Sequence, residues 1–170
     1  MYDKMTQKDI KRMEEEIEYR KLVVRKEALE DVKTARAHGD LSENFEYKAA
    51  KQFKNQNESR IRYLERMIKT AQIISETSNE DEVGLNDRVT IYYPEDDEEE
   101  TIKIVTTVRS NSLKGKISID SPLGKALLNK KVDDKVTVQG EAAGKEFYFD
   151  IVIRAIEKLE DTGEDELRKY

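Results

Sequence analysis

Apolar side chains in the first part of the chain recur every three or four residues, the spacing of one face of an α-helix. No proline or glycine occurs between residues 6 and 37, and helix-favouring residues dominate there. The pattern predicts a helix over about residues 6–37. Its seam contains Ile10, Met13, Ile17, Val24, Ala28 and Ala35, with Arg20 or Lys21 and Asp31 at the remaining turns and Leu22, Val23, Leu29 and Val32 beside it.

A second helix is predicted over about residues 42–75, after a break at Gly39, because glycine readily takes the left-handed conformation that ends helices. Two helices of similar length joined by a tight turn are expected to pair antiparallel as a coiled coil. Each helix of about 30 residues would span roughly 45 Å. The second seam, with two polar interruptions, reads Tyr47, Ala50, Lys54, Asn57, Ile61, Leu64, Ile68 and Ala71.

In the second half the period changes to two, which is typical of half-buried β-strands. Strands are expected near residues 88–93, 101–105, 116–119, 135–138 and 147–156. Leu123 to Leu128 follow Pro122 and predict a short helix, since proline is favoured in the first turn. The fold class is therefore α+β: an N-terminal antiparallel helical hairpin followed by a compact antiparallel sheet domain with one short helix.

These elements suggest four segments. Residues 1–75 form the hairpin, with its tip at 39–47, and residues 76–84 form a polar linker. Residues 85–157 form the sheet domain, and residues 158–170 form a charged tail that is frayed or helical.

Composition narrows the class of protein. Charged residues make up 40% of the 170-residue chain, which suits thin, solvated helices, and the net charge of −6 argues against a protein that coats nucleic acid. The absence of cysteine excludes disulfides, thiolate zinc sites and cysteine nucleophiles. With no signal peptide and no apolar run long enough to cross a membrane, we expect a soluble cytoplasmic protein without a membrane partner.

Two carboxylates, Asp40 and Glu43, fall in the turn between the helices. Asp40-Leu41-Ser42-Glu43 fits a capping box in which Asp40 caps the second helix and Glu43 reaches back to the Asp40 amide. The same carboxylates can hold a hard cation such as Mg²⁺, and the two interpretations are compatible. Because two carboxylates are too few for a complete site, such a metal would be shared with another molecule.

Basic residues flank this acidic tip: Arg36 before it and Lys48, Lys51 and Lys54 after it. They form either a solvated face or a strip that holds a phosphate backbone near a metal. The only histidine, His38, lies at the turn and is expected to be structural or neutral. The acidic run at residues 95–100 is expected to be a solvated hairpin loop, and no phosphate-binding loop or dinucleotide fingerprint occurs.

The tip sequence, from Gly39-Asp40-Leu41-Ser42-Glu43-Asn44 through Phe45-Glu46-Tyr47-Lys48-Ala49-Ala50, resembles the tip signature of the bacterial GreA/GreB transcript-cleavage factors. Residues 35–38, 60–65 and 119–128, the last including Asp120-Ser121-Pro122, are also similar to that family. The resemblance implies a coiled coil followed by an FKBP-like domain. The modest basic strip favours the GreA-like subclass, which releases short RNA fragments.

The resemblance also implies a mechanism. A monomeric factor without cofactor or enzymatic activity of its own would enter the secondary channel of a backtracked bacterial RNA polymerase. Asp40 and Glu43 match the catalytic tip acids that help the polymerase hold an active-site Mg²⁺ and orient the attacking water, so that it cleaves its transcript. Arg36 and Lys51 match the patch that contacts the RNA 3′ end. Asp120, Ser121 and Pro122 match the polymerase-docking region.

Several positions depart from the family pattern. Phe45 stands where alanine is common, Lys26 where proline is frequent, and Arg20 where leucine is usual. The main alternative is a paralogue that binds the same channel and modulates or inhibits the polymerase without cleavage. Two others are a peptidyl-prolyl isomerase that uses the second-half aromatic residues, and a purely structural coiled coil. The aromatic residues are Tyr92, Tyr93, Phe147, Tyr148 and Phe149.

Overall fold

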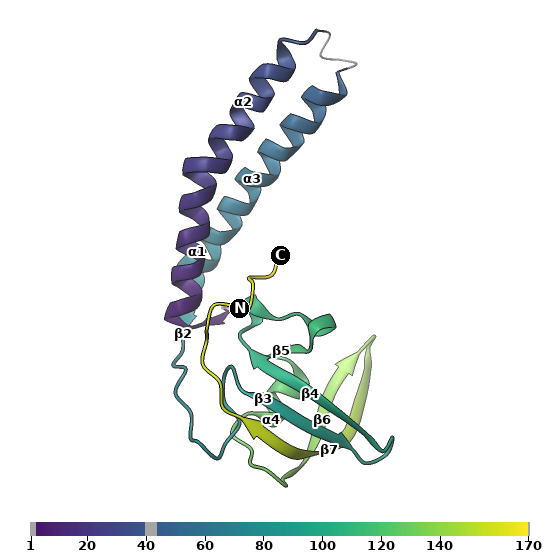
Figure 1. The fold of residues 1–170 in the computed structure, drawn as a ribbon. Helices are drawn as coiled ribbons and strands as arrows, with labels where there is room; N and C mark the ends of the chain where they lie inside the picture. Colours follow the sequence, from purple (N-terminus) through teal and green to yellow (C-terminus); the bar gives the residue numbers. More distant parts are fainter. Residues whose placement is uncertain (1–2, 40–43, 170) are drawn as a thin grey trace. The chain divides into compact units, whose positions relative to one another are not determined.

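The computed structural model describes residues 3–39 and 44–169, which divide into two compact units (Figure 1). The hairpin unit contains residues 7–71, and the sheet unit contains residues 3–6 and the chain from residue 72 onward. The predicted architecture, a helical hairpin followed by an α+β sheet domain, is confirmed. None of the helices among the described residues has the length and apolar character needed to cross a bilayer.

The first arm of the hairpin is three consecutive helical segments: α1 (Gln7–Tyr19), a π-helical turn η1 (Arg20–Val24) and α2 (Arg25–Arg36). The π turn has a cause in the sequence. Seam positions 10, 13, 17, 20 and 24 alternate steps of three and four, and the same alternation would continue at 27, 31 and 34. The seam instead continues at 28, 32 and 35, so the first arm contains one extra residue. The wider π turn absorbs that residue and keeps the stripe facing the partner helix. Of the flanking apolar residues, Val32 is buried while Leu22 and Leu29 are exposed.

The second arm is a single helix, α3 (Phe45–Thr70). Its predicted seam is confirmed, because Asn57, Ile61 and Leu64 are buried and the other seam residues are half-buried. The prediction that Asp40 caps this helix is wrong: the helix starts at Phe45, and Asn44 is its N-cap. Asp40 and Glu43 lie outside the described residues.

A polar cluster replaces apolar packing where the π turn faces α3. The Glu16 carboxylate accepts hydrogen bonds from Arg20 Nε at 2.8 Å and from Arg60 at 2.8 and 3.2 Å. Arg20 also donates to the Asn57 side chain at 3.0 Å, and Asn57 returns a bond to the Arg20 carbonyl at 3.3 Å. The cluster therefore supplies polar partners at the turn where Arg20 interrupts the seam.

The main sheet contains five strands in the order β5-β4-β3-β7-β6. They are β3 (Arg88–Tyr93), β4 (Glu98–Val105), β5 (Lys116–Ser118), β6 (Lys135–Ala142) and β7 (Lys145–Glu157). The pairs are antiparallel as predicted, except that β5 runs parallel to β4, so the sheet is mixed. The acidic run is a loop only in part, because Glu98 to Glu100 are the first residues of β4.

Shorter elements complete the sheet unit. The predicted short helix is α4 (Pro122–Leu127), and two single turns, η2 (Thr107–Arg109) and η3 (Ser112–Lys114), precede β5. A second, parallel pair joins β1 (Lys4–Met5) to β2 (Gln72–Ile73). The sequence predicted neither strand, and it placed residues 72–73 in the second helix. Residues 76–84, expected as a linker, belong to the sheet unit, and Val83 at their end is buried in its core.

The core of the sheet unit follows the period-two pattern of the strands. Buried pairs two residues apart come from four strands: Val89 and Ile91, Ile102 and Ile104, Val136 and Val138, and Ile151 and Ile153. Leu127 of α4 is fully buried against them. Tyr93, Phe147 and Phe149 also pack against this core, which accounts for most of the aromatic set.

Candidate functional site

Asn44 joins the two helices beside the predicted acidic tip. Its side-chain oxygen accepts a hydrogen bond from the Tyr47 amide at 3.0 Å, which caps α3, and its Nδ2 donates to the Ala35 carbonyl at 2.7 Å. On the first arm, α2 ends at Arg36 as expected, and Gly39 adopts a φ of +127° that favours glycine. One side chain therefore fixes both helix ends from which residues 40–43 depart.

Arg36 and Lys51, the two predicted RNA contacts, both act on the Tyr47 side chain. The Arg36 guanidinium lies 5.6 Å from the centre of the Tyr47 ring. Hydrogen bonding to Arg36 is the main cause that lowers the pKa of the Tyr47 phenol, and the charges of Lys51 and Lys54 lower it further. Arg36 therefore contacts the Tyr47 ring, and the charge of Lys51 acts on the same phenol.

The outer face of α3 carries part of the predicted basic strip. Lys48 and Lys51 line a recess of 460 Å³ whose other walls are amide and hydroxyl side chains: Gln52, Asn55, Gln56 and Ser59. Lys54 does not line it, because it takes a half-buried seam position. Of the three lysines in the predicted basic strip, only Lys48 and Lys51 therefore line this recess.

Phe45 is the most unusual residue near the tip. Its side chain is 80% exposed at the first position of α3, and the Lys48 ammonium lies 5.6 Å from the ring centre. An aromatic face with an adjacent cation suits contact with a nucleobase or with another planar group. Phe45 adds this possibility to the purely electrostatic strip predicted from the sequence.

His38, the histidine at the end of the first arm, has a partner on α3. His38 Nδ1 lies 3.0 Å from a carboxylate oxygen of Glu46, and both side chains are exposed. Within the described ranges 3–39 and 44–169, no group of three or more histidine and acidic side chains is placed to hold a metal ion. The predicted metal role of Asp40 and Glu43 stays a prediction, since both lie outside those ranges.

The predicted docking residues Asp120, Ser121 and Pro122 form a tightly hydrogen-bonded turn before α4. Ser121 is the N-cap: its Oγ accepts from the Gly124 amide at 3.0 Å and donates to the Ser118 carbonyl at 2.6 Å. Pro122 takes the first turn of the helix, as predicted. Gly124 is needed here, since a Cβ would lie 2.0 Å from the Ser118 carbonyl oxygen.

Thr107, which the sequence did not single out, holds the Asp120 side chain. Its hydroxyl donates to Asp120 Oδ2 at 2.9 Å and lies 2.6 Å from Ser118 Oγ. Sequence reasoning also missed the acidic side chains of the tail, Asp161 and Asp165. Their partners Arg109 and Lys103 lie 52 and 62 residues earlier in the chain, so no local pattern signals them.

Comparison with known proteins places both units in one family. Residues 3–73 match the family described as transcription elongation factor, N-terminal, and residues 77–154 match transcription elongation factor, GreA/GreB, C-term. Transcription elongation factor GreA of Bacillus subtilis (strain 168) is 46% identical over 135 residues, 79% of this chain and 86% of that protein. GreA of Geobacillus kaustophilus is 49% identical over 136 residues, with the same coverage.

Two solved structures of Gfh1 are also similar to the chain. A structure of the transcription factor Gfh1 is 28% identical, with a TM-score of 0.45, and covers 92% of this chain and 97% of that one. The Gfh1 protein of Thermus thermophilus is also 28% identical, with a TM-score of 0.42, and covers 93% of this chain and all of that one. From the two family matches and the identity to GreA proteins, the chain belongs to the GreA/GreB family of transcription elongation factors.

Proposed function

We propose that this protein stimulates the transcript-cleavage activity of bacterial RNA polymerase in backtracked, arrested complexes. The hairpin would enter the secondary channel and carry residues 40–43 to the polymerase active site. The observation that carries this proposal is that Arg36 and Lys51 both act on Tyr47, next to the Asn44 side chain that links the two helix ends. Membership in the GreA/GreB family supports it.

The donor chemistry of the tip fits a shared Mg²⁺ rather than a private one. Carboxylate oxygens are ligands that Mg²⁺ accepts, but Asp40 and Glu43 offer too few for a complete shell. Bound in the polymerase active site, Mg²⁺ would supply charge neutralisation and a more acidic water for hydrolysis. Asp40 and Glu43 would orient that water and accept its hydrogen bonds, and the factor alone would have no enzymatic activity.

Arg36 and Lys51 would contact the RNA 3′ segment. Arginine offers a planar fork to a phosphate and lysine a point charge, so the pair can hold a phosphate group without reading sequence. Arg36 lies over the Tyr47 ring, which holds its side chain close to the start of α3. We expect RNA contact to weaken as salt rises.

Asp120, Ser121 and Pro122 would dock the sheet unit on the polymerase rim. The Ser121 cap and the Thr107–Asp120 hydrogen bond predetermine the shape of this turn. A surface that needs no ordering loses less conformational entropy on binding. The turn is therefore well suited to hold the factor on the polymerase while the hairpin occupies the secondary channel.

The test uses halted, backtracked bacterial RNA polymerase with a 5′-labelled transcript and Mg²⁺. The unmodified protein should shorten the transcript and restart elongation, while Asp40→Asn with Glu43→Gln should bind the polymerase but not stimulate cleavage. Glu30→Gln with Asp31→Asn is the matched control, since it removes two exposed charges from the same hairpin. Full cleavage by the tip double variant would refute the proposed role of the tip.

A second candidate function, inhibition or modulation of the polymerase without cleavage, is favoured by one observation. Phe45 projects an apolar ring, 80% exposed, beside the tip. If the unmodified protein binds and slows nucleotide addition without shortening the transcript, Phe45→Ala separates the two functions. If Phe45→Ala then stimulates cleavage, the Phe45 ring is the cause of the missing cleavage in the unmodified protein.

The protein is further proposed to act as a monomer in the cytoplasm. The hairpin buries its own apolar seam within one chain, which removes the usual reason for helical hairpins to dimerise. A mass measurement by light scattering, before and after addition of polymerase, tests this.

A further inference from the structure

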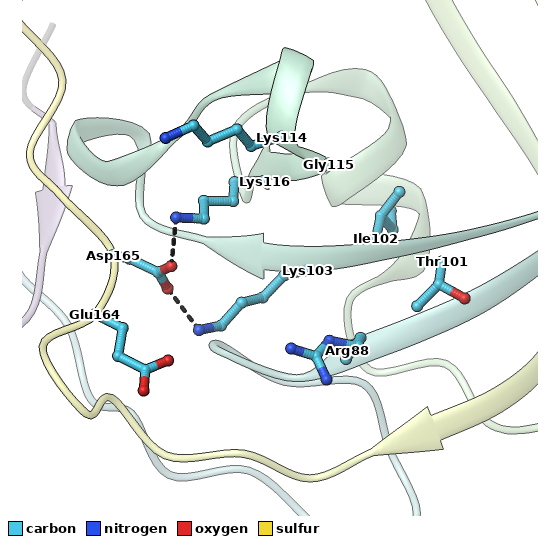
Figure 2. Close-up of a pocket in the computed structure, with 9 residues that line it drawn as sticks. All are labelled: Arg88, Thr101, Ile102, Lys103, Lys114, Gly115, Lys116, Glu164 and Asp165. Atoms are coloured by element: carbon cyan, nitrogen blue, oxygen red, sulfur yellow. Dashed lines mark hydrogen bonds and ion pairs between the residues drawn. The ribbon is translucent and has the colours of Figure 1, made fainter.

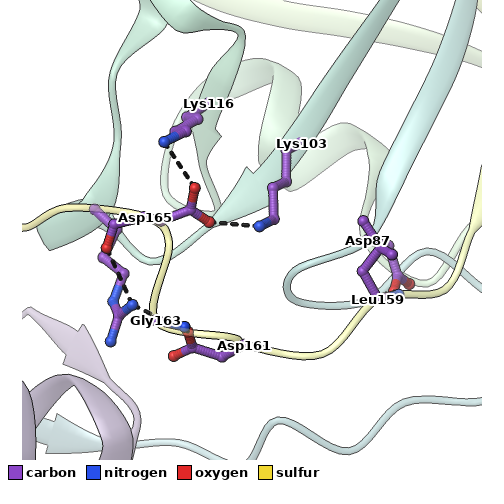
Figure 3. A network of polar contacts seen from close by, with 8 residues as sticks. Asp87, Lys103, Lys116, Leu159, Asp161, Gly163 and Asp165 are labelled. Carbon is purple, nitrogen blue, oxygen red and sulfur yellow. Dashed lines mark hydrogen bonds and ion pairs between the residues drawn. The ribbon is translucent and has the colours of Figure 1, made fainter.

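The charged tail is neither helical nor frayed over residues 158–169. It crosses the sheet unit as an irregular strap that is tied down along its length (Figure 3). Its contacts with the rest of the sheet unit include Lys158 Nζ to Asp87, the Leu159 amide to Asp87 at 3.2 Å, Asp161 to Arg109 at 3.1 Å, Asp165 to Lys103 and Lys116, and the Arg168 amide to the Val108 carbonyl at 2.7 Å.

The central contact of the strap is a carboxylate held between two ammonium groups. Asp165 Oδ2 lies 2.5 Å from Lys103 Nζ, and Oδ1 lies 2.7 Å from Lys116 Nζ (Figure 2). The Asp165 side chain is 7% exposed. Hydrogen bonds from both lysines hold the pKa of this carboxyl below its usual value, although burial alone would raise it.

The two lysines are positioned by the backbone rather than by the tail. Lys103 in β4 and Lys116 in β5 are direct register partners in the parallel pair, so they project from the same face of neighbouring strands. Two ammonium groups fixed side by side repel each other in a partly buried setting, and an oxyanion between them removes that cost. The strand pair thus forms a site for an oxyanion whichever group supplies it.

The space around Asp165 is cationic beyond these two contacts. A recess of 360 Å³ is lined by four basic side chains, Arg88, Lys103, Lys114 and Lys116, against two acidic ones, Glu164 and Asp165. Figure 2 shows Lys114 at the end of the turn η3, just before Lys116. A net positive recess in a chain with a net charge of −6 is a local concentration of charge that the tail only partly offsets.

We propose that Lys103 and Lys116 form an oxyanion-binding site for a phosphate group, which the chain's own Asp165 fills as an exchangeable internal ligand. Phosphate near neutral pH carries up to two negative charges and more acceptor oxygens than a carboxylate, so it matches two lysines better. The lysines lie inside the family-matched segment 77–154, whereas their present ligand lies beyond it. The occupant and the site therefore belong to different parts of the chain.

The tether explains why an external anion must compete for this site. Even a short flexible tether gives its ligand an effective concentration in the millimolar range, and the further contacts of the strap on both sides of Asp165 hold this ligand more closely. Free phosphate should therefore bind the unmodified protein weakly and bind tightly only when the Asp165 carboxylate is removed. The site should read the phosphate group itself, whether free or carried by a nucleotide.

The test is a phosphate titration of the full-length chain, read by calorimetry and by thermal unfolding at fixed ionic strength in chloride. Asp165→Ala should bind inorganic phosphate at least about 10-fold more tightly than the unmodified protein, as expected for removal of a tethered competitor. Phosphate should also raise its unfolding temperature toward that of the unmodified protein. Adding Lys116→Gln to Asp165→Ala should abolish both effects.

Asp81→Ala is the matched control, because Asp81 pairs with one lysine, Lys131, at an exposed position of the same unit. It should bind phosphate like the unmodified protein. A nucleoside 5′-monophosphate arm separates the two sources: equal affinity assigns recognition to the phosphate alone, and tighter nucleotide binding assigns a natural nucleotide ligand. Phosphate binding by Asp165→Ala no tighter than by Asp81→Ala would overturn the proposal and leave the tail as a purely structural strap.

A measurement on the unmodified protein covers the case in which Asp165→Ala does not fold. The Arg168 amide is hydrogen-bonded to the Val108 carbonyl only while the strap is in place. High phosphate should accelerate hydrogen exchange at this amide, and chloride at equal ionic strength should not. Equal exchange in the two salts would contradict displacement of the tail by phosphate.

Discussion

Replacing Glu16 with alanine removes the carboxylate that two arginines share across the hairpin. Glu16 accepts three hydrogen bonds, from Arg20 and Arg60, and the Arg60 side chain is 8% exposed. Breaking a fully buried ion pair costs about 3–5 kcal/mol, because the remaining charge stays desolvated. Glu16 itself is 25% exposed, so solvent screens part of the interaction. We expect a loss of about 2–3 kcal/mol.

The assay is thermal unfolding of the full-length chain, followed by helical circular dichroism. For a unit of 60–100 residues, each kcal/mol lowers the midpoint by about 4–8 °C, so the helical transition should fall by about 10–20 °C. Glu15→Ala, at an exposed position next to Glu16 on the same helix, is the control and should stay within about 0.5 kcal/mol. A loss below about 1 kcal/mol for Glu16→Ala would refute the view that this carboxylate compensates buried charge.

Three further predictions concern the caps, the docking turn and the tail. Asn44→Ala should cost about 1 kcal/mol of stability and speed hydrogen exchange at the Tyr47 amide, measured by NMR, since that amide loses its acceptor. Gly124→Ala should destabilise the sheet unit by about 1–3 kcal/mol in denaturant melts, because its Cβ would meet the Ser118 carbonyl oxygen. The lowered pKa of Asp165 means that its stabilisation is present above the ordinary aspartate pKa of about 3.9 and is lost as pH falls through the lower folded value. In pH-dependent melts, Asp165→Asn should lack that loss.

The hairpin was predictable because its signal is local and periodic. The α3 seam, including the polar residue Asn57, is the buried face of the helix. The choice of cap was not predictable in the same way. Asp40, Ser42 and Asn44 are all capable N-caps. Asn44 is the N-cap, and its side-chain amide also donates to the Ala35 carbonyl on the other helix. That contact between two helices cannot be read from the local sequence pattern.

The sheet unit shows a similar division. Alternation located the five strands of the main sheet but not the short β1–β2 pair, and the acidic run concealed the start of β4, because charge suggested a loop. Cross-strand partners stabilise those residues in the strand instead, including a hydrogen bond of 2.9 Å from the Tyr93 hydroxyl to Glu100. The sequence of the tail showed only that it is highly charged and did not predict that it is ordered. Its order depends on ion pairs with residues far away in sequence, such as Lys103.

The π turn at Arg20–Val24 has a consequence for how the length of this hairpin can change. Deleting one residue just after it would turn the seam 24, 28, 32, 35 into 24, 27, 31, 34, an uninterrupted heptad continuing from position 10. The bulge is thus equivalent to a single-residue insertion that left the packing on both sides in phase. In a continuous α-helix the same insertion would rotate everything beyond it by about 100° around the helix axis. In this hairpin the π turn takes up that rotation within one turn, so the seam still faces the partner helix on both sides of the extra residue. The two arms can therefore differ in length by one residue and remain paired up to the end of the hairpin.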